Sequence, residues 1–266
     1  MSTPRIVVPT ILFLLVASVA MAHDLFLKLD TYFLEPHTRV QIPVLNGTFT
    51  KSENFIARDR LADISVVSPR GRAKLVPAAA WSPGPDSTSL LSLELGDAGT
   101  YVAGASTRRR EISLTAEQFN AYLEEDGLPD VLDARRAAKE LGRDARERYS
   151  KHVKAVFQVG DAPGAGFDVV LGYPAEIVAL ENPYASGRGP SLRVRCLVDG
   201  RPVANQVVLW GGPGAERTTR TDSLGVVQVT LDAAGKWYVK FVHMERANRP
   251  GLDYESKWAT LTFETR

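Results

Sequence analysis

Residues 39–45 read Arg-Val-Gln-Ile-Pro-Val-Leu and are followed by Asn46-Gly47. Apolar and polar side chains alternate along this stretch, as in a strand with one buried face. Asn-Gly is a preferred hairpin dipeptide, so we expect the strand to end there. The pattern recurs between turn signals in three further stretches of the first half: residues 63–67, 90–95 and 100–105.

The second half contains seven short strand-like stretches separated by turn signals. They are residues 167–171, 175–180, 192–198, 206–210, 226–231, 237–242 and 258–263. Seven strands within about 100 residues fit an Ig-like β-sandwich.

A segment near residues 115–152 has a helical pattern instead. Thr115 and Gln118 form a capping-box pattern, and apolar residues follow at helical spacing. Gly127 and Pro129 should end this helix, and alternating charges over residues 131–152 predict a second, longer one. We therefore predict a mainly β protein with two Ig-like β-sandwich domains, residues 23–165 and 166–266, of which the first carries this helical insertion.

The first 22 residues have the pattern of a secretory signal peptide. Residues 6–20 are almost wholly apolar, and Ala20-Met21-Ala22 is an A-x-A cleavage signature. A transmembrane anchor is the alternative, but the apolar run is shorter than the roughly 20 residues that a spanning helix needs. Cleavage after Ala22 predicts a periplasmic or secreted protein that has no membrane span once processed.

Composition narrows the range of functions. The 32 Lys and Arg residues nearly balance the 31 Asp and Glu residues, which argues against a nucleic-acid binder that neutralises phosphates. A single cysteine, Cys196, excludes an intrachain disulfide and an iron–sulfur cluster, and its apolar surroundings predict a buried thiol. Nucleophile-elbow, P-loop, dinucleotide and zinc-protease motifs are absent, so we do not expect an enzyme.

His23 is the residue with the clearest chemistry. Cleavage after Ala22 would leave its imidazole and a free α-amine on one residue, and together they can chelate Cu(II) or Ni(II). Cleavage after Ala20 would instead place His23 third in the chain, which also favours a square-planar chelate. Asp24 could supply an oxygen ligand or orient the imidazole.

His243 is the candidate for a third nitrogen ligand. It follows the apolar stretch 237–242, and strand alternation should direct the neighbouring Met244 to the opposite face. A structural histidine hydrogen-bonded at a strand end is the alternative. We expect His37 to lie in a solvated loop and His152 to lie at the end of the longer helix.

Motifs spread along the mature chain are similar to those of the bacterial exported family called NikM-like, after a nickel-uptake component. They include Ala22-His-Asp-Leu-Phe-Leu27, Arg146-Glu-Arg-Tyr-Ser-Lys-His-Val-Lys154, Pro174-Ala-Glu-Ile-Val-Ala-Leu-Glu-Asn-Pro-Tyr184, Thr221-Asp-Ser-Leu-Gly225 and Val242-His-Met244. This resemblance implies the handling of nickel or a related metal outside the cytoplasm. The second half also resembles the carboxypeptidase-regulatory-like sandwich.

Three hypotheses follow for the function. The first is a metal-binding protein that takes part in nickel, copper or cobalt uptake, with His23, His243 and Asp24 at the site and a membrane transporter component as partner. The second is a non-catalytic envelope module that binds a protein or glycan. The third, a copper-dependent oxidase, would require an open coordination position.

Overall fold

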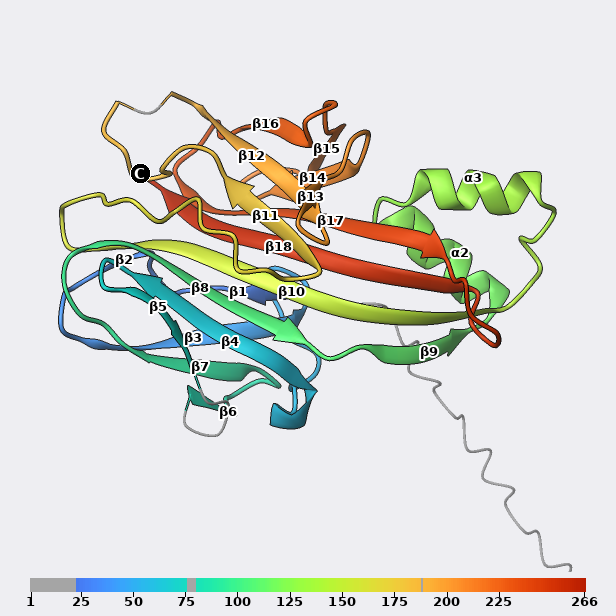
Figure 1. The fold of residues 1–266 in the computed structure, drawn as a ribbon, viewed down its shortest axis with the longest axis horizontal. Coiled ribbons are helices and arrows are strands. Elements are labelled where there is room, and N and C mark those ends of the chain that lie inside the picture. The colour runs from blue at the N-terminus through green and yellow to red at the C-terminus, as the bar shows by residue number, and fades with distance from the viewer. Residues whose placement is uncertain (1–22, 76–79, 188) are drawn as a thin grey trace, which may run out of the picture.

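The computed structural model describes residues 23–75, 80–187 and 189–266, so the predicted signal peptide, residues 1–22, lies outside the described residues. A ten-stranded sheet forms the middle of the molecule (Figure 1). Along its main path the strands follow the order β15 (Arg217–Arg220), β14 (Val207–Gly211), β17 (Gly235–Arg246), β18 (Tyr254–Thr265), β10 (Ala145–Val159), β8 (Gly99–Thr107), β4 (Leu61–Ser68) and β5 (Gly71–Lys74). The short strands β2 (Phe33–Leu34) and β9 (Arg110–Leu114) also pair with β10.

Two four-stranded sheets cover the faces of this central sheet. One contains β1 (Asp24–Leu27), β3 (Arg39–Gly47), β7 (Ser89–Glu94) and β6 (Trp81–Pro83). The other contains β11 (Ala175–Ala179), β12 (Ser191–Val198), β13 (Arg201–Pro202) and β16 (Val226–Thr230). Figure 1 shows the second sheet on the opposite side of the long strands from β3, β6 and β7.

Strand β10 contributes to a hydrophobic core on each of its faces. Val153, Ala155 and Phe157 pack with the β1–β3–β7–β6 sheet, whereas Val156 packs with the β11–β12–β16 sheet. This is the period-2 alternation of a strand buried on both sides. The mainly β class and the sandwich packing are as predicted.

The predicted boundary between residues 165 and 166 does not interrupt the central sheet. β10 from the first half and β18 from the second pair in parallel, from Glu147 with Tyr254 to Ala155 with Thr262. The two sandwiches therefore share their middle layer.

The helical insertion is shorter than predicted. Helix α2 (Ala116–Glu125) begins with the expected capping box, since the Thr115 and Gln118 side chains each accept from the other's backbone N–H. Helix α3 (Pro129–Ala137) follows. The prediction of one helix over 131–152 is wrong, because residues from Ala145 onward belong to β10, where ladders to β9 and β18 override the helical propensity of the local sequence.

Two further strand predictions require correction. Asn46 and Gly47 remain within β3, where they pair with Leu25 and Asp24, and the chain turns at residues 48–51 instead. Residues 167–171 are irregular rather than a strand.

Cys196 is fully buried as expected, and burial raises the pKa of its thiol. No helix in the described part of the chain is long and apolar enough to cross a bilayer.

Candidate functional site

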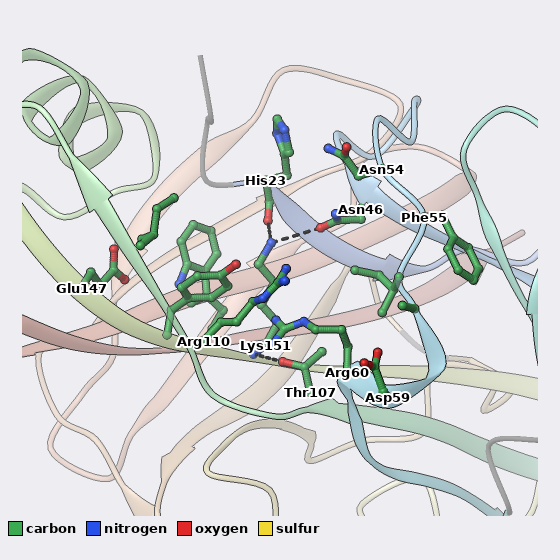
Figure 2. A pocket seen from close by; sticks show the side chains of 15 residues that line it. His23, Asn46, Asn54, Phe55, Asp59, Arg60, Thr107, Arg110, Glu147 and Lys151 are labelled. Carbon is green, nitrogen blue, oxygen red and sulfur yellow. Dashed lines mark hydrogen bonds between the residues drawn. The ribbon is translucent and has the colours of Figure 1, made fainter. Parts of the chain in front are cut away.

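A cavity of about 450 Å³ opens beside His23, where the described chain begins (Figure 2). Glu147, Tyr149 and Lys151 of β10 line one side of it, together with Trp258 of β18. Other lining residues come from the ends of β3 and β8, from β9 and from the segment before β4: Asn46, Asn54, Phe55, Ile56, Ala57, Asp59, Arg60, Thr107, Arg110 and Ile112. Its volume lies within the range of small-molecule sites.

Lys151 occupies the centre of this cavity. Its ammonium donates to the His23 carbonyl and, at 3.1 Å, to Asn46 Oδ1, as the dashed lines of Figure 2 show. The same ammonium lies 5.4 Å from the ring centroid of Trp258 and 5.7 Å from that of Tyr149. Burial lowers the pKa of Lys151 to about 8, against the attraction of Asp24 and Asp126. Lys151 thus holds the backbone at His23 against the central sheet.

Glu147 lies on the same face of β10 and is almost fully buried. The hydroxyl groups of Tyr122 and Ser256 donate to its Oε1. Burial raises its pKa to about 7, although both hydrogen bonds oppose this shift. The carboxyl group is therefore partly protonated near neutral pH.

Asp24 belongs to a second charged cluster on the other side of β1. Its Oδ2 accepts from Lys240 Nζ at 2.7 Å, and Lys240 also lies 3.7 Å from Asp126 and 3.6 Å from Glu216. Burial opposes the charge on Lys240, but the nearby acidic side chains, Asp24 above all, raise its pKa overall. The Asp24 carboxylate is thus bound by Lys240 rather than by the neighbouring imidazole.

The His23 imidazole is instead paired with Glu53, a residue that the sequence analysis did not single out. His23 Nε2 lies 3.0 Å from Glu53 Oε2, and the His23 side chain is only 18% exposed. Burial lowers the pKa of His23, while Glu53 opposes that shift. Glu53 follows the turn at 48–51, which brings it beside β1, and no spacing rule in the sequence indicates this contact.

The structure does not bring His243 to His23. His243 Nδ1 lies 3.0 Å from Gln206 Oε1, and its Nε2 lies 3.1 Å from Glu245 Oε1. Three positions separate it from Lys240 on β17, so the two side chains lie on opposite faces of the central sheet, and Lys240 is on the Asp24 side. Met244 packs on the opposite face from His243, as predicted. The expected His23–His243 pair is therefore corrected to His23–Glu53.

The other two histidines have separate surroundings. His37 is exposed near Asp97. His152 lies inside β10 rather than at a helix end, and its ring nitrogens hydrogen-bond Ser106 and Ser150. Within the described ranges, no group of three or more His, Cys, Asp or Glu side chains is placed to hold a metal ion.

Three solved structures that match this chain are distantly similar to it. The D0–D1 domain of Intimin is 13% identical, with a TM-score of 0.22 and coverage of 91% of this chain and 98% of that one. A Salmonella alpha-2-macroglobulin mutant is also 13% identical, with a TM-score of 0.27 and coverage of 91% and 15%. Fibronectin(III)-like modules of Clostridium thermocellum CbhA are 7% identical, with a TM-score of 0.21 and coverage of 93% and 91%. TM-scores this low carry no functional argument.

The sequence comparisons are more specific at the level of the family. A search among curated proteins finds no match. A family model matches residues 20–245, a span that includes His23, Glu53, Lys151 and the whole helical insertion. The chain therefore belongs to the family described as DUF4198, a domain of unknown function.

Proposed function

We propose that the processed chain is an exported protein that binds Cu(II) or Ni(II) at His23 and passes the ion to a membrane transporter component. The observation that carries this proposal is the contact between His23 Nε2 and Glu53 Oε2 at the start of β1. It places a carboxylate beside the one residue that signal-peptide cleavage would provide with a second nitrogen donor.

The donors at this position fit such an ion. Processing after Ala22 supplies the α-amine and the imidazole of His23, and Glu53 supplies an oxygen ligand or a carboxylate that orients the ring. The lowered pKa of His23 favours the neutral imidazole, which is the form that binds metals. Nitrogen donors with one carboxylate suit tetragonal Cu(II) or Ni(II).

The position of His23 is also held before any ion arrives. β1 pairs with β3, and the hydroxyls of Thr260 and Thr262 donate to the carbonyls of Leu25 and Leu27. Lys151 holds the His23 carbonyl in the same way. A rigid backbone reduces the ordering cost of binding, although the positive charge of Lys151 opposes a cation.

The resemblance to the NikM-like family supports nickel as the ion, and the pattern of residues 1–22 supports export. Nitrogen sites bind copper more tightly than nickel in general, so affinity alone does not select the physiological ion. The proposal includes no catalytic turnover.

The test is a titration of the processed protein, with its N-terminus confirmed by mass, against Cu(II) and Ni(II) in competition with a chelator. We expect one ion per chain. His23→Ala, and a variant with one extra residue ahead of His23, should lose tight binding. Glu53→Gln should weaken binding by roughly tenfold or more, as removal of supporting ligands does elsewhere.

His243→Ala is the matched control, because it removes an imidazole from the opposite face of the sheet, and its affinity should equal that of the parent. Unchanged affinity in both His23 variants would refute the proposal. Absence of stoichiometric binding would favour an envelope module that binds a protein or glycan.

A further inference from the structure

We propose that the cavity beside His23 binds a small organic carboxylate with a flat apolar body. The carboxylate would be held by Arg60 and Arg110, and the apolar part would lie against the aromatic side chains of the cavity. This inference concerns a ligand different from the metal ion of the proposed function and does not depend on it.

Three cationic side chains gather in this cavity. Figure 2 shows Arg60, Arg110 and Lys151 in its central part, and they come from three separate segments of the chain. Burial lowers the pKa of Arg60, and the charge of Arg110 lowers it further. Arg60 in turn contributes to the lowered pKa of Lys151. Arg60 is therefore close enough to both Arg110 and Lys151 for its charge to be repelled by theirs.

The two guanidinium groups are not neutralised by ion pairs. In the described ranges neither Arg60 nor Arg110 lies within salt-bridge distance of a carboxylate, whereas nearby Arg146 and Arg148 pair with Glu111 and Glu255. Arg60 donates one hydrogen bond to the Arg108 carbonyl, which leaves other N–H groups for a ligand. Guanidinium groups match carboxylate geometry through paired hydrogen bonds.

The cavity also contains carboxyl groups, but they do not cancel these charges. Asp59 attracts Arg60, yet burial and the charge of Arg110 still lower the pKa of Arg60 overall. Glu147 is held by two hydroxyl groups, and its raised pKa leaves it only partly charged. A bound anion is the partner that this arrangement lacks.

Aromatic and aliphatic side chains supply the complementary surface. Tyr149, Trp258 and Ile112 line the cavity beside the cations, and Phe55 lies among its lining residues with 40% of its surface exposed. An exposed phenylalanine on the loop before β4 gives an incoming ring a place to stack. A cavity of about 450 Å³ accommodates a molecule with one ring.

The test measures binding of benzoate, phenylacetate and 4-hydroxybenzoate to the processed protein by calorimetry. EDTA is present throughout, so that a failure of the metal proposal cannot affect the result. Benzamide serves as a neutral analogue, and acetate and inorganic phosphate serve as anions without a ring. We expect one site per chain for at least one aromatic carboxylate, with affinity at least about tenfold above all three comparison compounds and declining with salt.

Arg60→Gln and Arg110→Gln should each lower this affinity by about tenfold or more. Arg109→Gln is the matched control: its charge acts on His152 from the other face of β10, so binding should be unchanged. The proposal is overturned if no aromatic carboxylate binds, if benzamide binds as tightly, or if both variants bind as the parent does.

Discussion

The Lys154 ammonium lies 3.2 Å from Glu176 Oε2, and both side chains are almost fully buried between the central sheet and β11. Lys154 also donates to the Val169 carbonyl at 2.9 Å. Glu176 accepts from the backbone N–H groups of Leu171 and Tyr173. This ion pair ties β10 to the irregular segment that leads into the second half of the chain.

Removing either member of this pair should destabilise the protein by about 3 kcal/mol or more, because the remaining charge would stay buried without its partner. Glu176→Leu should cost more than Lys154→Met, since it also leaves the N–H groups of Leu171 and Tyr173 without an acceptor. Urea unfolding of the processed protein measures both changes.

The exposed pair Arg193–Glu181 provides the control for the buried one. Glu181→Gln should change the free energy of unfolding by less than about 1 kcal/mol. The Lys154→Met/Glu176→Leu double variant should be less destabilised than the sum of the single variants, because the same ion pair is lost in each. Additive effects would show that the two groups do not interact.

His152 should make stability depend on pH. Burial lowers its pKa from 6.5 to about 3, so the unfolded chain binds a proton more readily than the folded one between these values. The stabilising contribution of the neutral His152 side chain to the free energy of unfolding is complete above about pH 6.5. It falls by roughly 1.4 kcal/mol per pH unit as the pH drops toward 3. His152→Gln should reduce this slope, whatever its own cost in stability.

The measurement is a set of urea unfolding curves between pH 7 and pH 4. His37→Gln changes an exposed histidine and should keep the parental slope. If His152→Gln also keeps the parental slope, His152 is not the group responsible.

Asp126 should make the stability of the protein depend on pH in the direction opposite to that of His152. Burial, followed by the nearby charge of Asp24, raises its pKa to about 8. A carboxyl group whose pKa is raised by folding stabilises the protein fully below about pH 4, and this contribution is lost as the pH rises through 8. Asp126→Asn keeps the shape of the neutral acid but cannot ionise. The stability of this variant relative to the parent should therefore increase as the pH rises from about 4 to 8.

Asp24→Asn is the informative contrast, because it removes the carboxylate 2.7 Å from Lys240. We expect it to destabilise the protein by about 2 kcal/mol or more at neutral pH, and to lower the pKa of Asp126, which NMR titration can follow. Equal pH profiles for Asp126→Asn and the parent would contradict the assignment.

The sequence predicted those parts of the fold that depend on local patterns. Alternation located β3, β4, β7 and β8, and the Thr115 capping box located the start of α2. It did not predict residues 145–152 of β10, because their charged side chains have a helical pattern, whereas their positions depend on ladders to β9 and β18. The parallel pairing of β10 with β18 joins residues more than 100 positions apart, which no local pattern reveals.

The candidate site shows the same division between local and distant information. The signal-peptide pattern identified His23 as a candidate, because neighbouring residues alone predict the cleavage point that precedes it. Glu53 and Lys151, which contact His23, lie on other segments. Glu53 belongs to no motif, and the motif at residues 146–154 that contains Lys151 does not indicate a contact with His23. His243 was chosen because it follows an apolar strand-like stretch and belongs to a family-like motif. Neither observation shows which face of the central sheet its side chain occupies relative to His23, because that depends on how the strands pair.

Arg110 offers a final test, because a site kept for a ligand is not arranged for maximal stability. Arg110 makes no ion pair in the part of the chain that the structure describes, and its charge repels Arg60. Arg110→Gln should therefore leave stability unchanged or raise it by up to about 0.5 kcal/mol at low ionic strength, and salt should abolish the gain.

Arg148→Gln is the matched comparison, since Arg148 pairs with Glu255 at 2.5 Å and is largely buried, so its loss should cost about 2 kcal/mol. Thermal and urea unfolding at two salt concentrations separate the cases. A clear loss of stability in Arg110→Gln would mean that this guanidinium supports the fold and is not held free for an anion.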